Sequence, residues 1–446
     1  MSVLPPGSMR ATTVSRRISP DRPLALGASD AGAFRWEGVE SDLEVNVLAL
    51  WLESDAPSML VVTLDLLYPG TVLRAAVETA AAPLAAERII VAASHTHRAP
   101  MTDDTKPALG SPDPVYMSWL TDEVSSAVRD ALRERPSAVT LSVGETNAHH
   151  SINRRLRKRI VVARRPRINH FVNAPNPDGA TDERLTTLVV RDESERPVAI
   201  LWNYACHPVG SPVRNAISGH FPSHVREKLR AATGSHRLPV LFLQGFSGNV
   251  RPNASAEVHS RRRRLRQLVT GRLFEDMTWP SYRRWCESLA EIVHETVVTS
   301  APVLVTRLEG SRVTAPSEKF AVGAGKPEMS FSRLTIGDSL SLYAVSGEVV
   351  VEYATRLRER DPARYVMCVG CTDQVIGYLP TEEVLNEGGY EAGGYCASFD
   401  LERVAPGVDA AMMDAFVAVG LPESAPLLDG QSLQAHELRD PKRGDR

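Results

Sequence analysis

The sequence predicts an α/β fold (mixed α+β), with large mixed β-sheets that contain parallel βαβ units and are flanked by helices. Two observations support this class. Apolar runs of strand length, such as 59–67 and 89–93, alternate with segments of helical periodicity such as 71–87. The 446 residues contain no internal repeat, and α/β architectures commonly use such a length for one large core. We therefore expect a single domain over residues 23–421.

The two ends of the chain are predicted to lie outside this domain. Residues 1–22 combine prolines with charged residues and offer little apolar surface to bury. We expect them to form a flexible N-terminal arm, with order beginning near Leu24. Residues 422–446 are expected to form a polar tail.

Composition narrows the class of ligand and the compartment. The 51 Lys and Arg residues nearly balance 54 Asp and Glu residues, and the net charge of −3 gives no general reason to bind nucleic acid or to anchor stably on an anionic membrane. We expect a small-molecule substrate. No segment has the pattern of a signal peptide or a membrane span, so we expect a cytoplasmic protein.

The cysteines favour reduced thiols over a disulfide framework, because they are only five and odd in number. Cys368 and Cys371 form a lone Cys-x-x-Cys inside an apolar run. Without a second pair to complete a zinc site, we interpret them as small core residues of a strand.

The first predicted βαβ unit places two histidines at the end of a strand. The alanine-rich segment 71–87 connects the strands 59–67 and 89–93, which makes these strands parallel. Ligands of open parallel sheets gather at the carboxyl ends of the strands. His95 and His97 follow at that end, and residues two apart on an extended chain project to one side. The pattern predicts a shared metal ion; the alternative is two surface histidines in a turn.

Asp65 is a carboxylate inside the apolar run 59–67. Burial of a carboxylate is costly unless it is paired or hydrogen-bonded. Asp65 therefore either supports a metal-bound histidine or ties the backbone.

A second strand also delivers a histidine at its carboxyl end. Segments 185–190 and 197–204 are predicted to form paired strands, and His207 follows the second one. A lone histidine would be assigned to the core or the surface, but the repetition favours a common ion for His207, His95 and His97.

A carboxylate completes the pattern after a later strand. The apolar run 340–345 continues into Gly347-Glu348. Glu348 beside three histidines would give zinc three nitrogen ligands and one oxygen ligand, with one position left for water.

The remaining elements follow from the same periodicities. Further strands are predicted at 42–52 and 238–243, and further helices at 116–135, 222–233, 281–298 and 349–358.

Two further segments could contact a substrate. The basic cluster at 152–167 could hold a carboxylate or phosphate, but we interpret it as a solvated surface except for Arg154. Gly245 and Gly248 let the backbone approach a ligand and direct amide hydrogens at it; a plain tight turn is the alternative. The run Arg261–Arg264 is interpreted as a solvated face rather than a nucleic-acid patch.

With these residues assembled, the chain resembles the catalytic domain of the neutral, non-lysosomal ceramidase family of zinc amidases, over roughly Ile18 to Asp400. The motifs that carry the resemblance are short and spread along the chain. They are His95–Pro100 (His-Thr-His-x-x-Pro), Asn153-Arg154, His207-Pro208, Gly347-Glu348, Tyr378–Thr381 (Tyr-x-x-Thr) and Gly389-Tyr390-Glu391.

The resemblance implies the catalytic-domain fold of that family and zinc as a cofactor. The zinc ligands that it implies are His95, His97, His207, Glu348 and Tyr378. It further implies that Tyr390 helps to bind the reacting carbonyl.

The chain departs from the family at two positions of the expected site. In ceramidases a glycine-rich loop carries the serine that is the proposed nucleophile, but Arg251 stands there in this chain and cannot serve as a nucleophile. An aspartate downstream of the third histidine is replaced by His220. We expect no counterpart of the family's immunoglobulin-like carboxyl-terminal domain in this sequence.

These observations predict a zinc-dependent hydrolase that cleaves an amide (N-acyl) bond of a small polar or anionic substrate by metal-activated water. Tyr378 and Tyr390 would stabilise the oxyanion, and His220 would protonate the departing amine. Arg251 and Arg154 would bind an anionic group of the substrate. Two alternatives are open: a non-hydrolytic zinc enzyme, such as a cyclase or acyl transferase of a biosynthetic pathway, and a metal-bearing binding protein without catalysis.

Overall fold

The largest element of the fold is a nine-stranded mixed sheet with the strand order β10-β9-β8-β5-β1-β2-β3-β4, in which β12 also pairs with β5. The computed structural model describes residues 9–28, 38–160, 168–213, 215–254, 273–274, 277–323, 325 and 327–423. The strands of this sheet are β1 (Met9–Arg17), β2 (Glu44–Leu52), β3 (Met59–Leu64), β4 (Ile89–Ala93), β5 (Ser137–Asn147), β8 (Arg184–Arg191), β9 (Pro197–Tyr204), β10 (Val240–Gln244) and β12 (Ala301–Val303). Parallel pairing joins β3 to β4 and β9 to β10, and the other neighbours are antiparallel.

A second, four-stranded sheet packs against the first. It has the order β13-β15-β16-β18, with bounds Leu308–Ala315, Met329–Ile336, Leu340–Val345 and Tyr365–Val369. Val61 and Leu243 of the large sheet share one apolar core with Leu342 and Met367 of the small sheet. β2 and β3 are buried along almost their whole length, because this core covers one face and helices cover the other, which accounts for their continuous apolar sequence.

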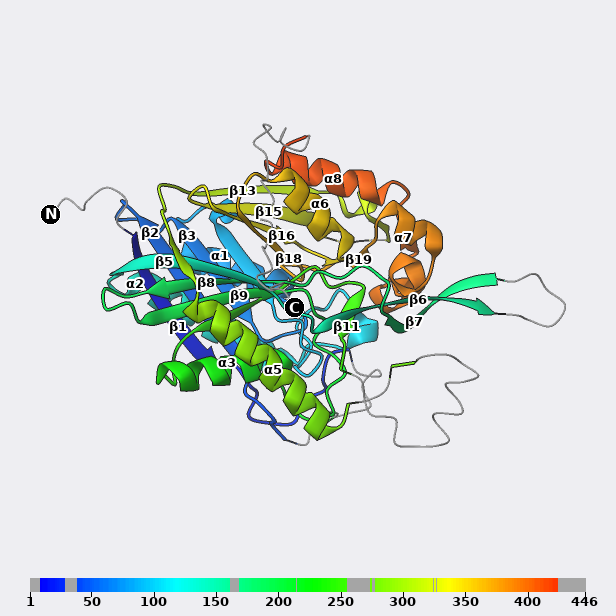
Figure 1. Ribbon diagram of the computed structural model, residues 1–446, viewed down its shortest axis with the longest axis horizontal. Coiled ribbons are helices and arrows are strands. Elements are labelled where there is room, and N and C mark those ends of the chain that lie inside the picture. The colour runs from blue at the N-terminus through cyan, green and yellow to red at the C-terminus, as the bar shows by residue number, and fades with distance from the viewer. Residues whose placement is uncertain are drawn as a thin grey trace, which may run out of the picture.

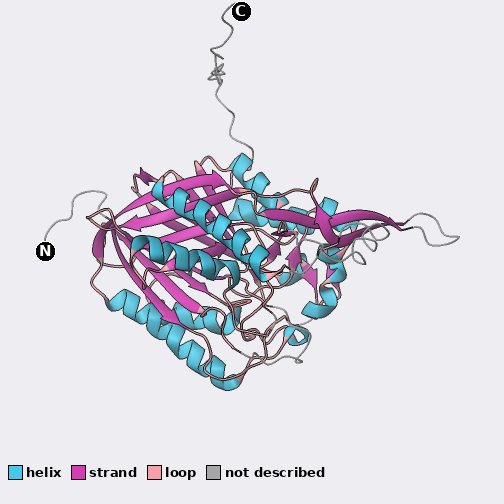
Figure 2. Cartoon of the chain, turned by 60° about the horizontal axis from the view of Figure 1, so that its bottom comes forward, coloured by secondary structure: helices cyan, strands magenta, loops and turns pink. Residues whose placement is uncertain are grey.

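Helices cover the outer faces of both sheets, so that the molecule has four layers (Figures 1 and 2). The large sheet is covered by α1 (Gly70–Ala81), α2 (Pro114–Arg133), α3 (His220–Thr233) and α5 (Trp279–Val298). The small sheet is covered by α6 (Glu352–Arg360) and α8 (Val408–Ala418). Figure 1 shows α6 and α8 on one side of the two sheets and α3 and α5 on the other.

The described residues also form three small sheets and a further short helix. β11 (Val250–Pro252) pairs with β6 (Ser151–Ile160), which pairs with β7 (Ile168–Asn176), and Figure 1 shows β6 and β7 projecting from the body. The other two pairs are β14 (Ala321–Val322) with β20 (Arg403–Val404), and β17 (Glu348–Val349) with β19 (Tyr378–Leu379). The helix α7 spans Glu382–Glu387.

The predicted fold class is confirmed, and so are its main local elements. β3, α1 and β4 form the expected parallel βαβ unit, and β8 and β9 form the expected antiparallel pair. α1 ends at Ala81 rather than at residue 87, because Pro83 lacks the amide hydrogen that a helix requires. All five cysteines are free and buried, as expected for reduced core thiols.

The prediction that order begins near Leu24 is wrong. Met9–Arg17 forms β1, which lies inside the large sheet and pairs with both β2 and β5. All nine residues of β1 pair with β2, and its first three residues also pair with β5, so ordered structure begins well before Leu24. Two predicted segments lie outside the described residues, apart from residues 422 and 423. They are the polar tail at 422–446 and the arginine run Arg261–Arg264.

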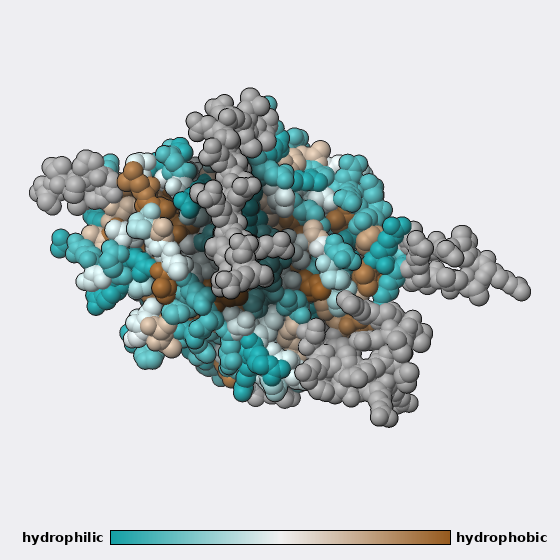
Figure 3. Space-filling view, in the orientation of Figure 1, coloured by the Kyte–Doolittle hydropathy of each residue, from teal (hydrophilic) through white to brown (hydrophobic). Residues whose placement is uncertain are grey.

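On the face shown in Figure 3, hydrophilic residues predominate and apolar residues lie in small separate groups. Among the described residues, no helix combines the length and the apolar character that crossing a membrane would need. The cytoplasmic location stays a prediction.

Candidate metal centre

A short connecting segment brings the ends of several strands together. The amide of Gly370 donates to the carbonyl of Gln244 at the end of β10 (2.9 Å), and the amide of Cys371 donates to Gly347 (3.0 Å). The amide of Ala93, the last residue of β4, donates to the carbonyl of Cys371 (3.0 Å). Residues 370 and 371 therefore hold strand ends of the large sheet beside the segment that follows β16.

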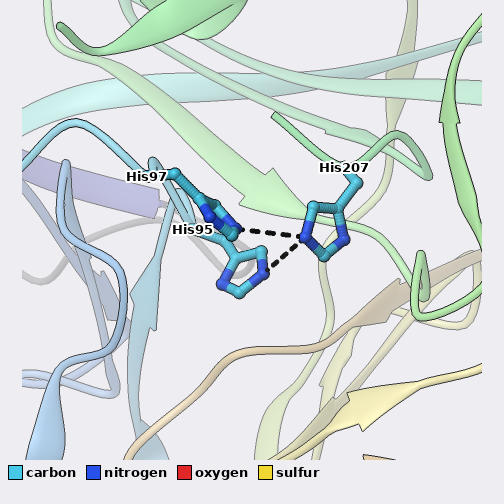
Figure 4. Close-up of side chains that lie close together, drawn as sticks. All are labelled: His95, His97 and His207. Atoms are coloured by element: carbon cyan, nitrogen blue, oxygen red, sulfur yellow. Dashed lines mark hydrogen bonds between the residues drawn. The ribbon is translucent and has the colours of Figure 1, made fainter. Parts of the chain in front are cut away.

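Three histidines converge at this point (Figure 4). His95 and His97 follow β4, and His207 follows β9. The Nε2 atom of His207 lies 3.0 Å from Nε2 of His95 and 3.2 Å from Nε2 of His97. One ligand atom from each of the three lies within 4.8 Å of the others, so the group could hold a metal ion, as the sequence predicted.

Glu348 is the fourth predicted ligand and lies against this group. Its Oε2 atom is 3.4 Å from Nε2 of His95, and its side chain is 3 % exposed. The hydroxyl of Tyr68 donates a 2.6 Å hydrogen bond to Oε1 of the same carboxylate. The backbone carbonyl of Leu67 lies 3.2 Å from Nδ1 of His95, which fixes the orientation of that ring.

Tyr378, which the family resemblance implies as a ligand, lies directly beside Glu348. The two residues are register partners in the parallel pair of β17 and β19. Hydrogen bonding to Tyr378 helps to lower the pKa of the Glu348 carboxyl. The ring of Tyr390 lies 5.3 Å from the ring of Tyr378, in an edge-on arrangement.

Arg154 is a buried cation behind these two phenols. Its guanidinium carbon is 5.5 Å from the ring centre of Tyr378 and 5.6 Å from that of Tyr390. Its Nε donates to Glu391 (2.8 Å) and its Nη2 donates to the carbonyl of Gly248 (2.6 Å). The sequence indicated a solvated surface for the basic cluster with the exception of Arg154, and the burial of Arg154 agrees with that exception. Two nitrogens of Arg154 already donate to protein acceptors.

The ionisation pattern concentrates one positive charge next to Glu348. Burial opposes the charged form of His95, but the nearby Cys371 and Glu348 outweigh burial and raise the pKa of His95 well above its usual range. Burial, together with the charge of His95, lowers the pKa of His97 and of His207. Burial alone would raise the pKa of Glu348, but His95 and the hydrogen bonds to the carboxylate lower it. His97 and His207 are therefore neutral, and each can offer the lone pair of a ring nitrogen.

His220 lies at the start of α3 in a constrained conformation. Its φ of 55° is in the left-handed region, and its Nε2 is buried without a hydrogen-bond partner. Ser218 accepts from the amide of His220 (2.9 Å) and donates to Glu40 (2.8 Å), which holds the turn. Burial and then the charge of Arg98 lower the pKa of His220 to about 3. The ring is therefore neutral at pH 7, so it can donate a hydrogen bond but does not hold an additional proton.

Arg251 packs on an aromatic ring. Its guanidinium carbon is 4.1 Å from the ring centre of Phe274, and a Cβ atom built on Gly210 would come within 2.7 Å of its Nη2. Burial raises the pKa of Cys206 well above its usual value, and the charge of Arg251 partly offsets this rise. Substrate binding by Arg251 stays a prediction.

The prediction that Gly245 and Gly248 direct amide hydrogens at a ligand is wrong. The amide of Gly245 donates to the carbonyl of Tyr204 (3.0 Å), and that of Gly248 donates to Val349 (2.8 Å). Both glycines allow close backbone contact instead. A Cβ on Gly245 would lie 2.6 Å from the backbone of Ala205, and a Cβ on Gly248 would lie 2.7 Å from the carbonyl of Glu348.

Asp65 ties the backbone rather than supporting a histidine. Its Oδ2 accepts hydrogen bonds from the amide of Glu44 (3.1 Å) and from Arg226 of α3 (2.7 Å). Of the two alternatives that the sequence left open, the backbone tie is confirmed.

Sequence reasoning missed Tyr68, Glu391 and Arg155. Arg155 is buried and pairs with Glu391 (3.0 Å) and Glu387 (3.0 Å), so it is not part of a solvated surface. Tyr68 follows β3 at the same sheet edge as His95, and the rule that ligands gather at carboxyl ends would have found it. Glu391 follows Tyr390 within a family motif, but its two arginine partners lie far away in the sequence.

Comparisons with known proteins show the fold. No protein-family model and no curated protein sequence matches the chain. The structure is similar to that of neutral ceramidase from Pseudomonas aeruginosa, with a TM-score of 0.72 and 15 % identity over 94 % of this chain and 76 % of that chain. It is also similar to a ceramidase complexed with C2, with a TM-score of 0.68 and 15 % identity over 95 % of this chain and 78 % of that chain. The chain thus has the fold of neutral ceramidases.

Proposed function

We propose that this chain, which has the neutral ceramidase fold, is a zinc-dependent hydrolase that cleaves an amide (N-acyl) bond of a small polar or anionic molecule. The observation that supports this most directly is the convergence of His95, His97, His207 and Glu348 from separate strand ends of two sheets. The proposal takes its reaction class, amide hydrolysis, from the ceramidases of the same fold.

The residues present fit a divalent metal ion. Two pairs of Nε2 atoms lie only 3.0 and 3.2 Å apart, which is a favourable contact only if a proton or a metal ion lies between them. Oε2 of Glu348 is buried and has no hydrogen-bond partner, although a buried carboxylate oxygen normally has one. Imidazole nitrogens with one carboxylate oxygen form a donor set typical of zinc.

A zinc ion held by these residues would supply Lewis-acid activation of a water molecule and of the substrate carbonyl. The hydroxyls of Tyr378 and Tyr390 would donate hydrogen bonds to the negative charge that develops on the carbonyl oxygen. Arg154, behind both rings, would stabilise that charge and keep the phenols in place. This arrangement needs no nucleophilic side chain, which agrees with arginine at position 251.

His220 would contact the nitrogen side of the scissile bond. Because its pKa of about 3 leaves the ring neutral at pH 7, we assign it hydrogen bonding to the departing amine. Protonation of the amine by His220 then requires that the ring first gain a proton during the reaction.

Elemental analysis together with one substrate screen tests the function. Purified protein should contain about one zinc per chain, and His207→Ala should lose both the metal and the activity. The screen should compare N-acyl amino acids, acyl amines and simple esters, so that amide and ester hydrolysis are separated. Less than stoichiometric metal in the wild type, or unchanged metal content and activity in His207→Ala, would rule out the proposed centre.

A further inference from the structure

Two consecutive residues after β3 contact two of the candidate ligands. The carbonyl of Leu67 lies 3.2 Å from Nδ1 of His95, and the hydroxyl of Tyr68 donates to Oε1 of Glu348 at 2.6 Å. His95 follows a strand of the large sheet, and Glu348 follows a strand of the small one. The segment after β3 therefore connects the two halves of the metal centre.

The hydrogen bond from Tyr68 makes the two oxygens of Glu348 unequal. Oε1 is occupied by the phenol, whereas Oε2 lies 3.4 Å from Nε2 of His95 and has no hydrogen-bond partner. Tyr68 donates through its only hydrogen, which lies on the phenol oxygen 2.6 Å from Oε1. Oε2 is then the oxygen that is directed at the histidines.

A buried cation covers the ring of Tyr68. Nζ of Lys106 lies 5.3 Å from the ring centre, and it donates to Oδ2 of Asp103 at 2.5 Å. The hydroxyl of Thr102 donates to the backbone carbonyl of Tyr68 at 2.6 Å. A cation over a phenol ring is attracted to the π-face and withdraws electron density, which strengthens the O–H as a donor.

We propose that Tyr68, covered by Lys106, is a positioning residue that orients Glu348 so that only Oε2 binds the metal. This inference rests on the metal centre of the proposed function. Groups that hydrogen-bond to a metal ligand typically change metal affinity by about 10- to 100-fold when they are removed. Tyr68 should therefore act on metal affinity and coordination geometry without touching the substrate.

The test measures metal binding rather than turnover. Apoprotein is titrated with Zn²⁺ against a chelator of known affinity, and with Co²⁺ while the visible absorption bands that report coordination geometry are recorded. Tyr68→Phe should weaken Zn²⁺ binding about tenfold or more and change the Co²⁺ spectrum. The double variant Asp103→Asn/Lys106→Met removes the cation without leaving a buried carboxylate unpaired, and it should weaken Zn²⁺ binding at least threefold. It provides the test if Tyr68→Phe does not fold.

Tyr353→Phe is the matched control. Tyr353 is another fully buried phenol of the same apolar core, and its hydroxyl contacts Pro380 and Asp409 rather than a ligand. The variant Tyr353→Phe should lose as much thermal stability as Tyr68→Phe but keep the wild-type metal affinity and Co²⁺ spectrum. The inference is overturned if Tyr68→Phe weakens binding less than tenfold, if Tyr353→Phe weakens it equally, or if the double variant binds like the wild type. A wild type that binds neither metal would refute the proposed function itself.

Discussion

The carboxylate of Glu391 is a buried group near the candidate centre, and its loss should lower the stability of the fold. It is 3 % exposed and lies between two buried guanidinium groups. Oε1 accepts from Nε of Arg154 at 2.8 Å, and Oε2 accepts from Nη1 of Arg155 at 3.0 Å. Glu391→Gln keeps the size of the side chain and one acceptor oxygen, but it removes the charge that balances both cations.

The magnitude follows from what each arginine retains. Removing one partner of a buried ion pair costs about 3–5 kcal/mol, because the remaining charge stays desolvated. Arg155 keeps its contact with Glu387 at 3.0 Å, so most of the loss arises at Arg154, which keeps the carbonyl of Gly248 and the phenol of Tyr378. We therefore expect Glu391→Gln to lower the free energy of unfolding by about 3 kcal/mol, the lower end of that range.

Urea denaturation followed by circular dichroism measures this loss, with Glu387→Gln as the control. Glu387 contacts the same Arg155 over a similar distance, but its side chain is 33 % exposed. A solvent-screened pair of this kind contributes about 0–1 kcal/mol. If the two variants lose equal stability, or if Glu391→Gln loses less than about 1 kcal/mol, burial does not determine the strength of the ion pairs of Glu391.

Three other predictions concern the substrate and pH. Arg251→Ala should keep the metal and lose about 2–4 kcal/mol in kcat/KM for an anionic substrate but far less for a neutral analogue; equal losses, or none, would show that the anion site lies elsewhere. Long-chain ceramide should be turned over slowly or not at all, because arginine stands at the serine position of the ceramidases; efficient hydrolysis in detergent would contradict this. Burial opposes ionisation of Glu40, but His224 and then the hydroxyls of Ser218 and Ser41 outweigh it and lower its pKa from 4.5 to about 2. The stabilisation from Glu40 is thus fully present above pH 4.5 and is lost as the pH falls towards 2, so the stability difference between the wild type and Glu40→Gln should vanish over that interval.

The candidate ligands could be predicted because each one follows an apolar strand. His95, His97, His207 and Glu348 stand within a few residues of a strand end, where ligands of parallel strands usually lie. Because β4 and β9 are not neighbours in the large sheet, the connecting residues 370 and 371 rather than strand pairing bring these ends together. The prediction that Tyr378 is a metal ligand depended on the resemblance to a family. Its partnership with Glu348 arises from the two-residue pairing of β17 and β19, which is too short to leave a periodicity in the sequence.

The errors have a common physical origin in pairings between distant segments. β1 depends on hydrogen bonds to β2 and β5 rather than on its own apolar pattern. Arg155 is buried because Glu391, far along the chain, neutralises it, and no local composition indicates this. The amides of Gly245 and Gly248 are occupied by carbonyls whose proximity only the folded backbone reveals.

The candidate metal centre draws its residues from both layers of strands, because the histidines follow strands of the nine-stranded sheet and Glu348 follows a strand of the four-stranded one. Under the proposed function, metal binding and the docking of the two sheets would be thermodynamically linked, and each would strengthen the other by the same factor. Cavity-forming substitutions between the sheets, such as Leu342→Ala, would then weaken metal binding from a distance, while bound metal would act as a clamp that resists separation of the layers.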